Sequence, residues 1–378
     1  ACALGGITLH SFAGIGLGND DAETMVAKVM GKQEARERWR HAEVLIIDEI
    51  SMIDGDLFDK LNYVAKIIRK KVGNHYRSCF GGIQLIVTGD FFQLPPVKAT
   101  NRMKYFAFEA ECWDKCFDLQ IELKHAFRHS EGSFVEMLNE IRKGSPTDQT
   151  LQNLMNCQRV LPDGGLGIVP TRLYPLKADV KEENMKELRA LNKETLKFTA
   201  LDMAESPVFE VMLNTMRAEN ELAICVGAQV MLIVNYDTKI GLVNGAKGIV
   251  VGFDSLPHKE DDVKEEIARR VSPTLKWPVV RFYCDRTERT IGPETFTLEC
   301  GGREVVKRIQ VPLILAWALS VHKCQGMTLD RVQTDLSKAF DYGMVYVALS
   351  RVKKLDGLQL LGFDHTKIKV HPNVVCYY

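Results

Sequence analysis

Two adjacent carboxylates are the first residues of this sequence that could perform chemistry. Asp48 and Glu49 directly follow the apolar run 44–47, which is typical of a buried strand. One carboxylate can hold the Mg²⁺ ion that bridges two phosphates, and the other can orient or deprotonate the attacking water. The structural alternative is a strand followed by an acidic N-cap of the next helix. The pair indicates nucleotide hydrolysis with only moderate specificity.

A second pattern is more specific. The apolar run 83–87 leads into Thr88-Gly89-Asp90, and Gln93 follows just before Pro95-Pro96. Gln93 is placed to sense a γ-phosphate through a hydrogen bond, while the two prolines stiffen the exit of the chain. A purely structural strand requires neither the Asp nor the Gln. The pattern therefore predicts a second group of phosphate-site residues.

A third set of polar residues lies near the end of the chain. The segment 316–328 contains His322-Lys323-Cys324-Gln325-Gly326, and the segment 346–352 contains Arg351. An arginine presented across a cleft can stabilise the charge that develops on a transferring phosphoryl group, and Arg351 suits that role. Arg128 is a second candidate. Taken alone, either arginine is more often a surface ion pair.

The elements that must position these residues alternate between strands and helices. The runs 44–47, 83–87 and 312–318 are predicted to be buried parallel strands. Helices are predicted at 60–71 and 134–143 from the spacing of their apolar residues. This alternation predicts an α/β layered fold, in which ligands bind at the carboxyl ends of the strands.

The pattern changes after about residue 220. Short β-type runs at 226–234, 248–253, 279–284 and 294–300 are broken by Asn-Gly and Gly-Gly. They predict a small antiparallel barrel or sheet inserted into the second α/β unit. The charge-rich stretch 258–270 is more typical of a solvated helix or loop than of a binding element.

Composition limits the class of protein. With 378 residues, of which 46% are hydrophobic, the chain can form two or three domains. Lys+Arg and Asp+Glu number 49 each, so any nucleic-acid contact must come from a local patch. No apolar run is long enough for a membrane span. The ten irregularly spaced cysteines predict reduced thiols and an intracellular protein.

The ordered set of motifs resembles the Pif (petite integration frequency) family of DNA helicases, in superfamily one, with RecD-like relatives. The matching segments follow the family's order over nearly the whole chain. They are the first DNA-contacting motif at 6–14, the second ATPase motif at Asp48-Glu49, the signature segment 57–80 running into Gly81-Gly82 and Gly89-Asp90-Phe91, the Arg128 segment, the turn 241–245, the segment 322–326 and the Arg351 segment.

The resemblance implies a domain plan. Two RecA-like domains are expected, the first at 1–125 and the second at 126–240 together with 316–378. A small β-barrel-like domain is expected as an insertion at 241–315. A small wedge insertion is expected in the first domain at about 18–40.

The resemblance also implies roles for single residues, with ATP and Mg²⁺ as cofactors. Asp48 would hold magnesium through its water shell, Glu49 would activate the hydrolytic water, and Gln93 would read the γ-phosphate. Arg128 and Arg351 would act as arginine fingers, and Gln325 and Gly326 would contact the nucleotide. The residues expected to contact DNA are His10, Ser11, Phe12, Asn244, His322 and Lys323. Stacking on Phe12 fits sequence-tolerant binding of a single strand.

The implied activity is ATP-driven 5′ to 3′ movement on single-stranded DNA with unwinding of the duplex. Forked or partial duplex DNA is the further expected partner, with no membrane association. We expect a monomer in the nucleus or mitochondrion that serves DNA repair, recombination or telomere maintenance.

One departure from the family is the lack of any Gly-x-x-x-x-Gly-Lys-Ser/Thr phosphate loop; Gly31-Lys32 has neither the glycine spacing nor the hydroxyl. We expect the loop to lie upstream of residue 1, and this chain alone to bind ATP poorly and to hydrolyse it negligibly. Two alternatives stay open. One is a loop-less paralogue that grips single-stranded nucleic acid without turnover, and the other is an RNA helicase.

Overall fold

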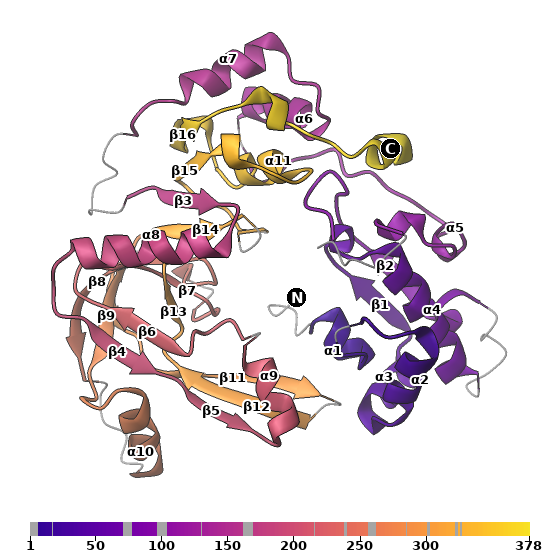
Figure 1. The fold of residues 1–378 in the computed structure, drawn as a ribbon, viewed down its shortest axis with the longest axis horizontal. Helices are drawn as coiled ribbons and strands as arrows, with labels where there is room; N and C mark the ends of the chain where they lie inside the picture. Colours follow the sequence, from indigo (N-terminus) through magenta and orange to yellow (C-terminus); the bar gives the residue numbers. More distant parts are fainter. Residues whose placement is uncertain are drawn as a thin grey trace.

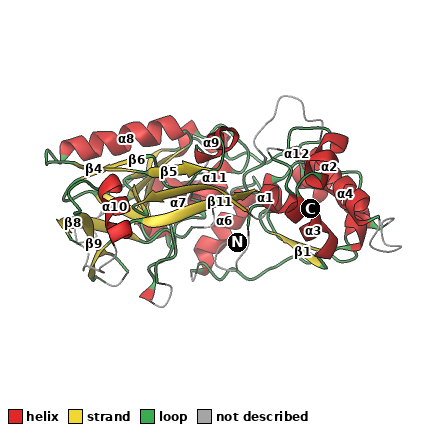
Figure 2. Cartoon of the chain, turned by 90° about the horizontal axis from the view of Figure 1, so that it is seen from below, coloured by secondary structure: helices red, strands yellow, loops and turns green. Residues whose placement is uncertain are grey.

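The structure of the chain is a computed structural model, and two lobes joined by an extended segment are its main feature (Figure 1). It describes residues 7–378 except 17, 71–77, 97–103, 130, 162–168, 215, 238–239, 256–261, 285, 301–302, 322–323 and 326. We call residues 7–117 the first lobe, 118–129 the connecting segment and 131–368 the second lobe. Figure 2 shows the helix-rich first lobe beside the strand-rich second lobe.

The first lobe is built on two short parallel strands. Its helices and strands are α1 Leu9–Ala13, α2 Ala22–Met30, α3 Gln33–His41, β1 Val44–Ile47, α4 Gly55–Arg69, β2 Gln84–Val87 and α5 Trp113–Cys116. The predicted strands 44–47 and 83–87 are confirmed as β1 and β2, which pair in parallel with Val44 opposite Gln84. The helix predicted at 60–71 is α4. It begins earlier, because the carboxylate of Asp54 accepts a hydrogen bond from the Leu57 amide and caps the first turn.

Arg69, at the end of α4, ties the first lobe together. Its Nη1 atom donates to the carbonyl oxygens of Trp39, Arg40 and Ala42 at 2.8, 2.9 and 2.9 Å. Its Nε atom donates to the carbonyl of Gly81 at 2.8 Å. One guanidinium therefore satisfies the end of α3 and the glycine turn that leads into β2.

Replacing Arg69 by Met should destabilise the chain by about 2–4 kcal/mol, because the carbonyls that it satisfies lose a charged donor. Urea unfolding followed by circular dichroism measures the change. Lys70→Met is the matched control, because Lys70 is exposed on the same helix end. Equal midpoints for the two variants would show that Arg69 does not hold these segments together.

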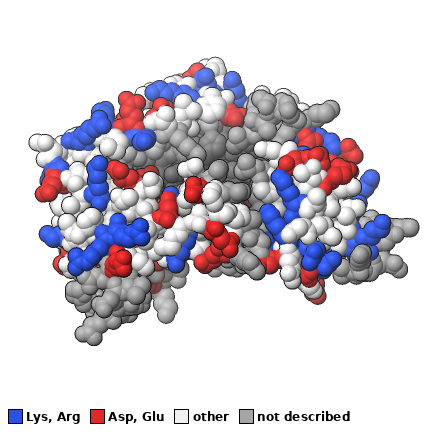
Figure 3. Space-filling view, turned by 60° about the horizontal axis from the view of Figure 1, so that its bottom comes forward, with Lys and Arg blue, Asp and Glu red and all other residues white. Residues whose placement is uncertain are grey.

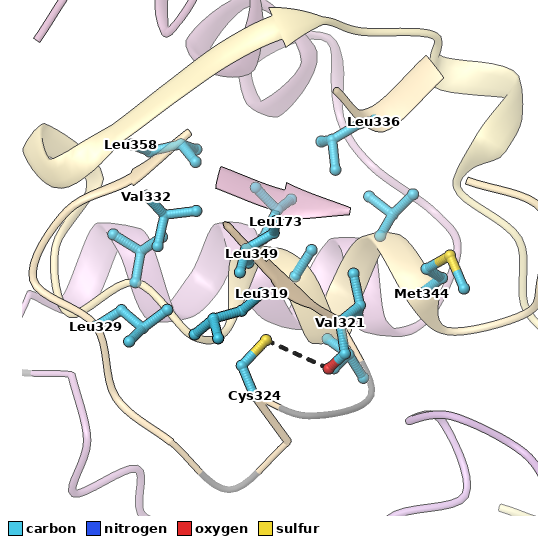
Figure 4. Packing of buried hydrophobic residues seen from close by; sticks show 14 of the residues in the cluster. Leu173, Leu319, Val321, Cys324, Leu329, Val332, Leu336, Met344, Leu349 and Leu358 are labelled. Atoms are coloured by element: carbon cyan, nitrogen blue, oxygen red, sulfur yellow. Dashed lines mark hydrogen bonds between the residues drawn. The ribbon is translucent and has the colours of Figure 1, made fainter. Parts of the chain in front are cut away.

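A four-stranded parallel sheet forms the centre of the second lobe. Its order is β14-β3-β15-β16, and all three pairings are parallel. The strands and the helices that accompany them are β3 Thr171–Tyr174, β14 Ala318–Ser320, β15 Val332–Asp335, β16 Leu358–Gly362, α6 Gly132–Arg142, α7 Asp148–Asn156, α8 Lys177–Ala190 and α11 Met344–Leu349. The helix predicted at 134–143 is confirmed as α6. Apolar side chains from the sheet and α11 interdigitate with the buried Cys324, whose thiol donates to the carbonyl of Val321 at 3.3 Å (Figure 4).

Antiparallel sheets make up the rest of the second lobe. Five strands have the order β10-β9-β8-β7-β13, three have the order β11-β12-β5, and β4 pairs with β6. Each predicted β-type run overlaps one strand, and the charge-rich stretch 258–270 contains most of α10. The bounds are β4 Leu196–Thr199, β5 Leu201–Ala204, α9 Pro207–Leu213, β6 Glu221–Ile224, β7 Gln229–Leu232, β8 Lys247–Asp254, α10 Asp262–Val271, β9 Trp277–Phe282, β10 Glu288–Thr290, β11 Glu294–Cys300, β12 Arg303–Gln310 and β13 Leu313–Leu315.

The single parallel strand predicted at 312–318 is wrong. β13 pairs antiparallel with β7, whereas β14 pairs in parallel with β3, so the run contributes to two different sheets. The chain crosses between the sheets at Ala316 and Trp317, and both residues are buried. Because the crossing itself is buried, the apolar pattern continues through it and hides the break.

The last helix, α12 Pro372–Tyr377, returns to the first lobe. Val374 is buried in the first lobe's apolar core, and Val370 and Tyr377 pack against the same core. The Trp113 Nε1 atom donates to the Tyr377 hydroxyl at 3.2 Å. The predicted domain boundaries are not tested by these contacts and stay predictions. Among the described residues, no helix is both long and apolar enough to cross a membrane.

Candidate nucleotide and nucleic-acid site

The carboxyl ends of β1 and β2 bring the first predicted acidic residues together. The Asp48 Oδ1 atom accepts hydrogen bonds from the Thr88 hydroxyl at 2.5 Å and from the Glu49 amide at 3.0 Å. Glu49 has left-handed backbone angles, with φ 56° and ψ 49°, which are uncommon for a residue with a side chain. Strained angles of this kind are often found at functional sites. The neighbouring strand ends thus form one polar edge, as the parallel sheet predicts.

Glu49 reaches across to the second lobe. The Gln325 Nε2 atom donates to the Glu49 Oε2 atom at 3.1 Å. Burial raises the pKa of Glu49 above its ordinary value, against the lowering effect of the Gln325 hydrogen bond. The Gln325 Oε1 atom is buried and has no hydrogen-bond partner among the described residues. A raised pKa at a polar strand end is typical of a general base.

The two predicted arginine fingers converge on one turn. Arg351 is only 2% exposed, and its Nε and Nη2 atoms donate to the Val347 carbonyl at 3.0 Å and the Ser350 hydroxyl at 2.8 Å. Its Nη1 atom is buried without a partner among the described residues. Arg128, in the connecting segment, donates to the Ser350 carbonyl at 3.4 Å. Burial, and then the nearby charge of Arg128, lower the pKa of Arg351.

Gln93 lies in the loop that follows β2. Its amide donates to the Asp90 carbonyl at 3.0 Å, and its side chain is half-buried. The Asp90 carboxylate is held from the second lobe by Arg142, a residue that the sequence patterns did not select. Arg142 stands at the end of a predicted helix, and nothing in its local sequence marks a partner far away in the chain.

His10, Ser11 and Phe12, the predicted DNA contacts of the first motif, lie on α1. Arg38 donates to the carbonyls of Ser11 and Phe12 at 2.9 and 3.1 Å, so α3 satisfies the end of this short helix. The Phe12 ring packs edge-on against Trp39 with centroids 5.2 Å apart, and Phe12 is half-buried. Ser11 is half-buried and His10 is exposed. In this arrangement the Phe12 ring is partly used for packing.

A cavity in the second lobe is lined both by Asn244, a predicted DNA contact, and by Gln325, a predicted nucleotide contact. Its volume is about 950 Å³, and Asn244, Lys247, Gln325 and Asp330 contribute to its lining. The Lys247 ammonium donates to the Thr171 hydroxyl, and burial lowers its pKa to about 8. His322, Lys323 and Gly326 lie outside the described residues. The structure therefore brings Asn244 and Gln325 to one cavity, while His10, Ser11 and Phe12 lie on the other lobe.

The local charge distribution is mixed. In the view of Figure 3, lysine and arginine side chains alternate with acidic side chains and do not form one uniformly basic face. This agrees with the equal counts of acidic and basic residues. Any grip on a phosphate backbone must therefore come from particular side chains.

The family follows from comparison with known proteins. The model of the "PIF1-like helicase" family matches residues 1–152, and that of the "DNA helicase Pif1, 2B domain" matches residues 211–253. A crystal structure of Pif1 helicase from Candida albicans is 40% identical, covers all of this chain and 85% of that chain, and has a TM-score of 0.83. This chain belongs to the PIF1-like helicase family. The α/β fold class with RecA-like domains is thereby confirmed, whereas the details of the insertions stay predictions.

Two further proteins that are similar to this chain are Pif1 helicases. An ATP-dependent DNA helicase PIF1 from Emericella nidulans is 42% identical over 414 residues, covering all of this chain and 54% of the relative. A Pif1 helicase from Bacteroides, crystallised with ADP-AlF3 and single-stranded DNA, is 28% identical, with a TM-score of 0.63 over 98% of this chain and 82% of that chain. The chain spans about half the length of the curated relatives that it matches.

The donor set at the β1 edge fits the magnesium that the PIF1-like resemblance implies. Asp48, Glu49 and Thr88 offer only oxygen atoms, which Mg²⁺ prefers. No group of three or more His, Cys, Asp or Glu side chains that could hold a metal occurs in the described part of the chain.

Proposed function

We propose that this chain is the motor region of an ATP-dependent DNA helicase, which couples ATP hydrolysis to 5′ to 3′ movement on single-stranded DNA and to unwinding. The observation that carries the proposal is the contact between Glu49 of the first lobe and Gln325 of the second, with the buried Arg351 close enough to influence the Glu49 charge. The names of the relatives, and the nucleotide and single strand bound to the Bacteroides protein, support it.

In the proposed reaction, Glu49 accepts a proton from the water that attacks the γ-phosphate. Magnesium, when bound with ATP, would neutralise charge on the phosphates, and Asp48 would hold it through water. Gln93 contacts the γ-phosphate by hydrogen bond. Arg351 from the second lobe and Arg128 from the connecting segment stabilise the charge on the transferring group. We assign nucleotide contacts to Gln325, whose amide reaches Glu49, and to Gly326, which lies outside the described residues.

Movement follows from the placement of these groups on two lobes. ATP contacted by both lobes draws them together, and loss of the γ-phosphate allows them to separate. If the DNA-contacting residues of the two lobes bind the strand alternately, each cycle of hydrolysis moves the protein along the DNA. We assign the DNA contacts to His10, Ser11 and Phe12 on the first lobe and to Asn244, His322 and Lys323 on the second.

The exposed apolar face of the small sheet supports a phosphate loop upstream. In β1 and β2, Ile46 is 66% exposed and Ile86 43% exposed. In the extended connecting segment, Leu119, Ile121 and Leu123 alternate with polar residues and are 73%, 72% and 90% exposed. Parallel sheets in α/β proteins are normally covered on both faces. We propose that a strand, loop and helix upstream of residue 1 cover Ile46 and Ile86 and include the phosphate loop.

The test compares ATP hydrolysis by the 378-residue chain and by a chain extended upstream through the expected phosphate loop, with and without single-stranded DNA. We expect hydrolysis only from the extended chain, with acceleration by DNA, because the loop's amides and lysine hold the β- and γ-phosphates. If both chains are silent yet bind DNA, the loop-less binder is the better description. Acceleration by RNA in place of DNA would indicate an RNA helicase.

We extend the proposal to the cellular setting. The relatives' name, ATP-dependent DNA helicase, supports action on DNA. We propose that this action takes place in the nucleus or mitochondrion and serves repair, recombination or telomere maintenance. Forked or partial duplex DNA is the proposed substrate, and the motor is proposed to act as a monomer. Unwinding of a forked duplex at limiting protein, with sedimentation of the protein–DNA complex, tests both statements.

A further inference from the structure

Arg142 is fixed to the second lobe by the helix that carries it. It is the last residue of α6, and Phe134, Met137, Leu138 and Ile141 of that helix are buried in the core of the parallel sheet. A shift of α6 relative to the sheet would break this packing, since well-packed cores do not deform continuously. Arg142 therefore moves together with the second lobe.

The guanidinium of Arg142 crosses to the loop after β2 in the first lobe. Its Nε and Nη2 atoms donate to the two carboxylate oxygens of Asp90 at 2.9 and 2.8 Å. Each of these side chains is 16% exposed. A two-point bond of this kind fixes direction as well as distance, and a lysine cannot reproduce it. The same carboxylate accepts a hydrogen bond from the Phe92 amide at 3.1 Å, so it also orders the backbone of the loop.

Two further parts of the chain hold the same loop. The Arg142 guanidinium lies 4.4 Å from the centre of the Phe92 ring, and Phe92 stacks on Tyr378 with centroids 4.8 Å apart. The Phe91 amide donates to the Tyr378 hydroxyl at 3.4 Å. At the start of α11, Gly343 lies so close that a Cβ there would be 2.5 Å from the carbonyl oxygens of Phe92 and Gln93.

We propose that Arg142 is a positioning residue that couples the loop 90–93 to the second lobe, so that a change at Gln93 is transmitted to α6. The inference rests on the proposed function, in which Gln93 contacts the γ-phosphate. Gln93 follows Asp90 by three residues, and its amide donates to the Asp90 carbonyl. A displacement of Gln93 therefore moves the carboxylate that Arg142 holds. The Asp90–Arg142 bond is the rigid link from the phosphate to the core of the second lobe.

Hydrogen exchange of the 378-residue chain tests the link itself. In Arg142→Gln and Arg142→Lys, the amides of the loop 90–93 should exchange about tenfold faster or more, because the loop loses its two-point bond. The strand 44–47 serves as the internal reference and should not change. Arg159→Gln is the matched control, because it breaks an exposed pair with Asp356 in the same lobe. Unchanged exchange in the loop, or equal acceleration in the reference strand, would overturn the proposal.

The chain extended through the phosphate loop tests the coupling. Arg142→Lys should lower the base pairs unwound per ATP hydrolysed by about tenfold, while the kcat of DNA-stimulated hydrolysis changes less than about threefold. A proportional loss of both rates, or values equal to those of Arg159→Gln, would overturn the coupling role. If the unsubstituted extended chain hydrolyses no ATP, it is the proposed function that fails. If it hydrolyses ATP and unwinds DNA, the Arg142 result decides the inference alone.

Discussion

Glu49→Gln in the extended chain should lower the kcat of DNA-stimulated ATP hydrolysis by about 10²–10⁴-fold while nucleotide binding is retained, because the amide cannot accept the proton of the attacking water. The substitution keeps the shape of the side chain, so Gln325 still has a partner. The measurements are steady-state hydrolysis and binding of a fluorescent ATP analogue.

The pH dependence of the same reaction gives an independent readout. Burial raises the pKa of Glu49, and a general base acts only when deprotonated. The kcat should therefore fall as the pH drops through a value above the ordinary pKa of a glutamate, and this limb should vanish in Glu49→Gln. Glu43→Gln is the matched control, because Glu43 is exposed just before the start of β1. Turnover preserved in Glu49→Gln would remove Glu49 from the role of base.

Arg351→Lys should reduce kcat by about 10³-fold or more, since an arginine finger typically contributes 10³–10⁵ to phosphoryl transfer. Lysine keeps the positive charge but cannot present two donors in a fixed plane. The Nη1 atom of Arg351 has no partner among the described residues and is the donor free to meet a phosphoryl oxygen. Single-turnover hydrolysis at saturating ATP measures the effect on the chemical step.

Folding must be separated from catalysis in this experiment, because Arg351 is buried. Lysine should preserve the fold better than alanine, and the thermal midpoint of the variant is compared with that of the unsubstituted chain. Affinity for single-stranded DNA should stay within about threefold, because the proposed role concerns the phosphate only. A stable variant with normal kcat would exclude Arg351 as the finger and leave Arg128, which donates to the same turn from the connecting segment.

The local elements of the site could be predicted from the sequence because their signals are carried by neighbouring residues. The apolar run before Asp48-Glu49 became β1, and the run before Gly89-Asp90 became β2. Parallel pairing of these strands then places both acidic ends at one edge. The motif order also indicated the family, which the family models and the Candida albicans structure confirm.

Longer-range features could not be predicted in the same way. The run 312–318 carries no local sign that it divides between two sheets, because Ala316 and Trp317 are as buried at the crossing as their neighbours are in the strands. The packing of α12 on the first lobe also has no local signal, since the apolar residues of a short helix do not indicate which distant core they join.

The sequence by itself therefore determined which residue types stand at the strand ends, and hence the class of chemistry and the family. Only the tertiary structure decided which of them meet: Gln325 with Glu49, Arg128 with the turn of Arg351, and Arg142 with Asp90. Strand and helix patterns arise from residues a few positions apart. Contacts between groups far apart in the chain depend instead on how whole lobes pack, and no single segment encodes that.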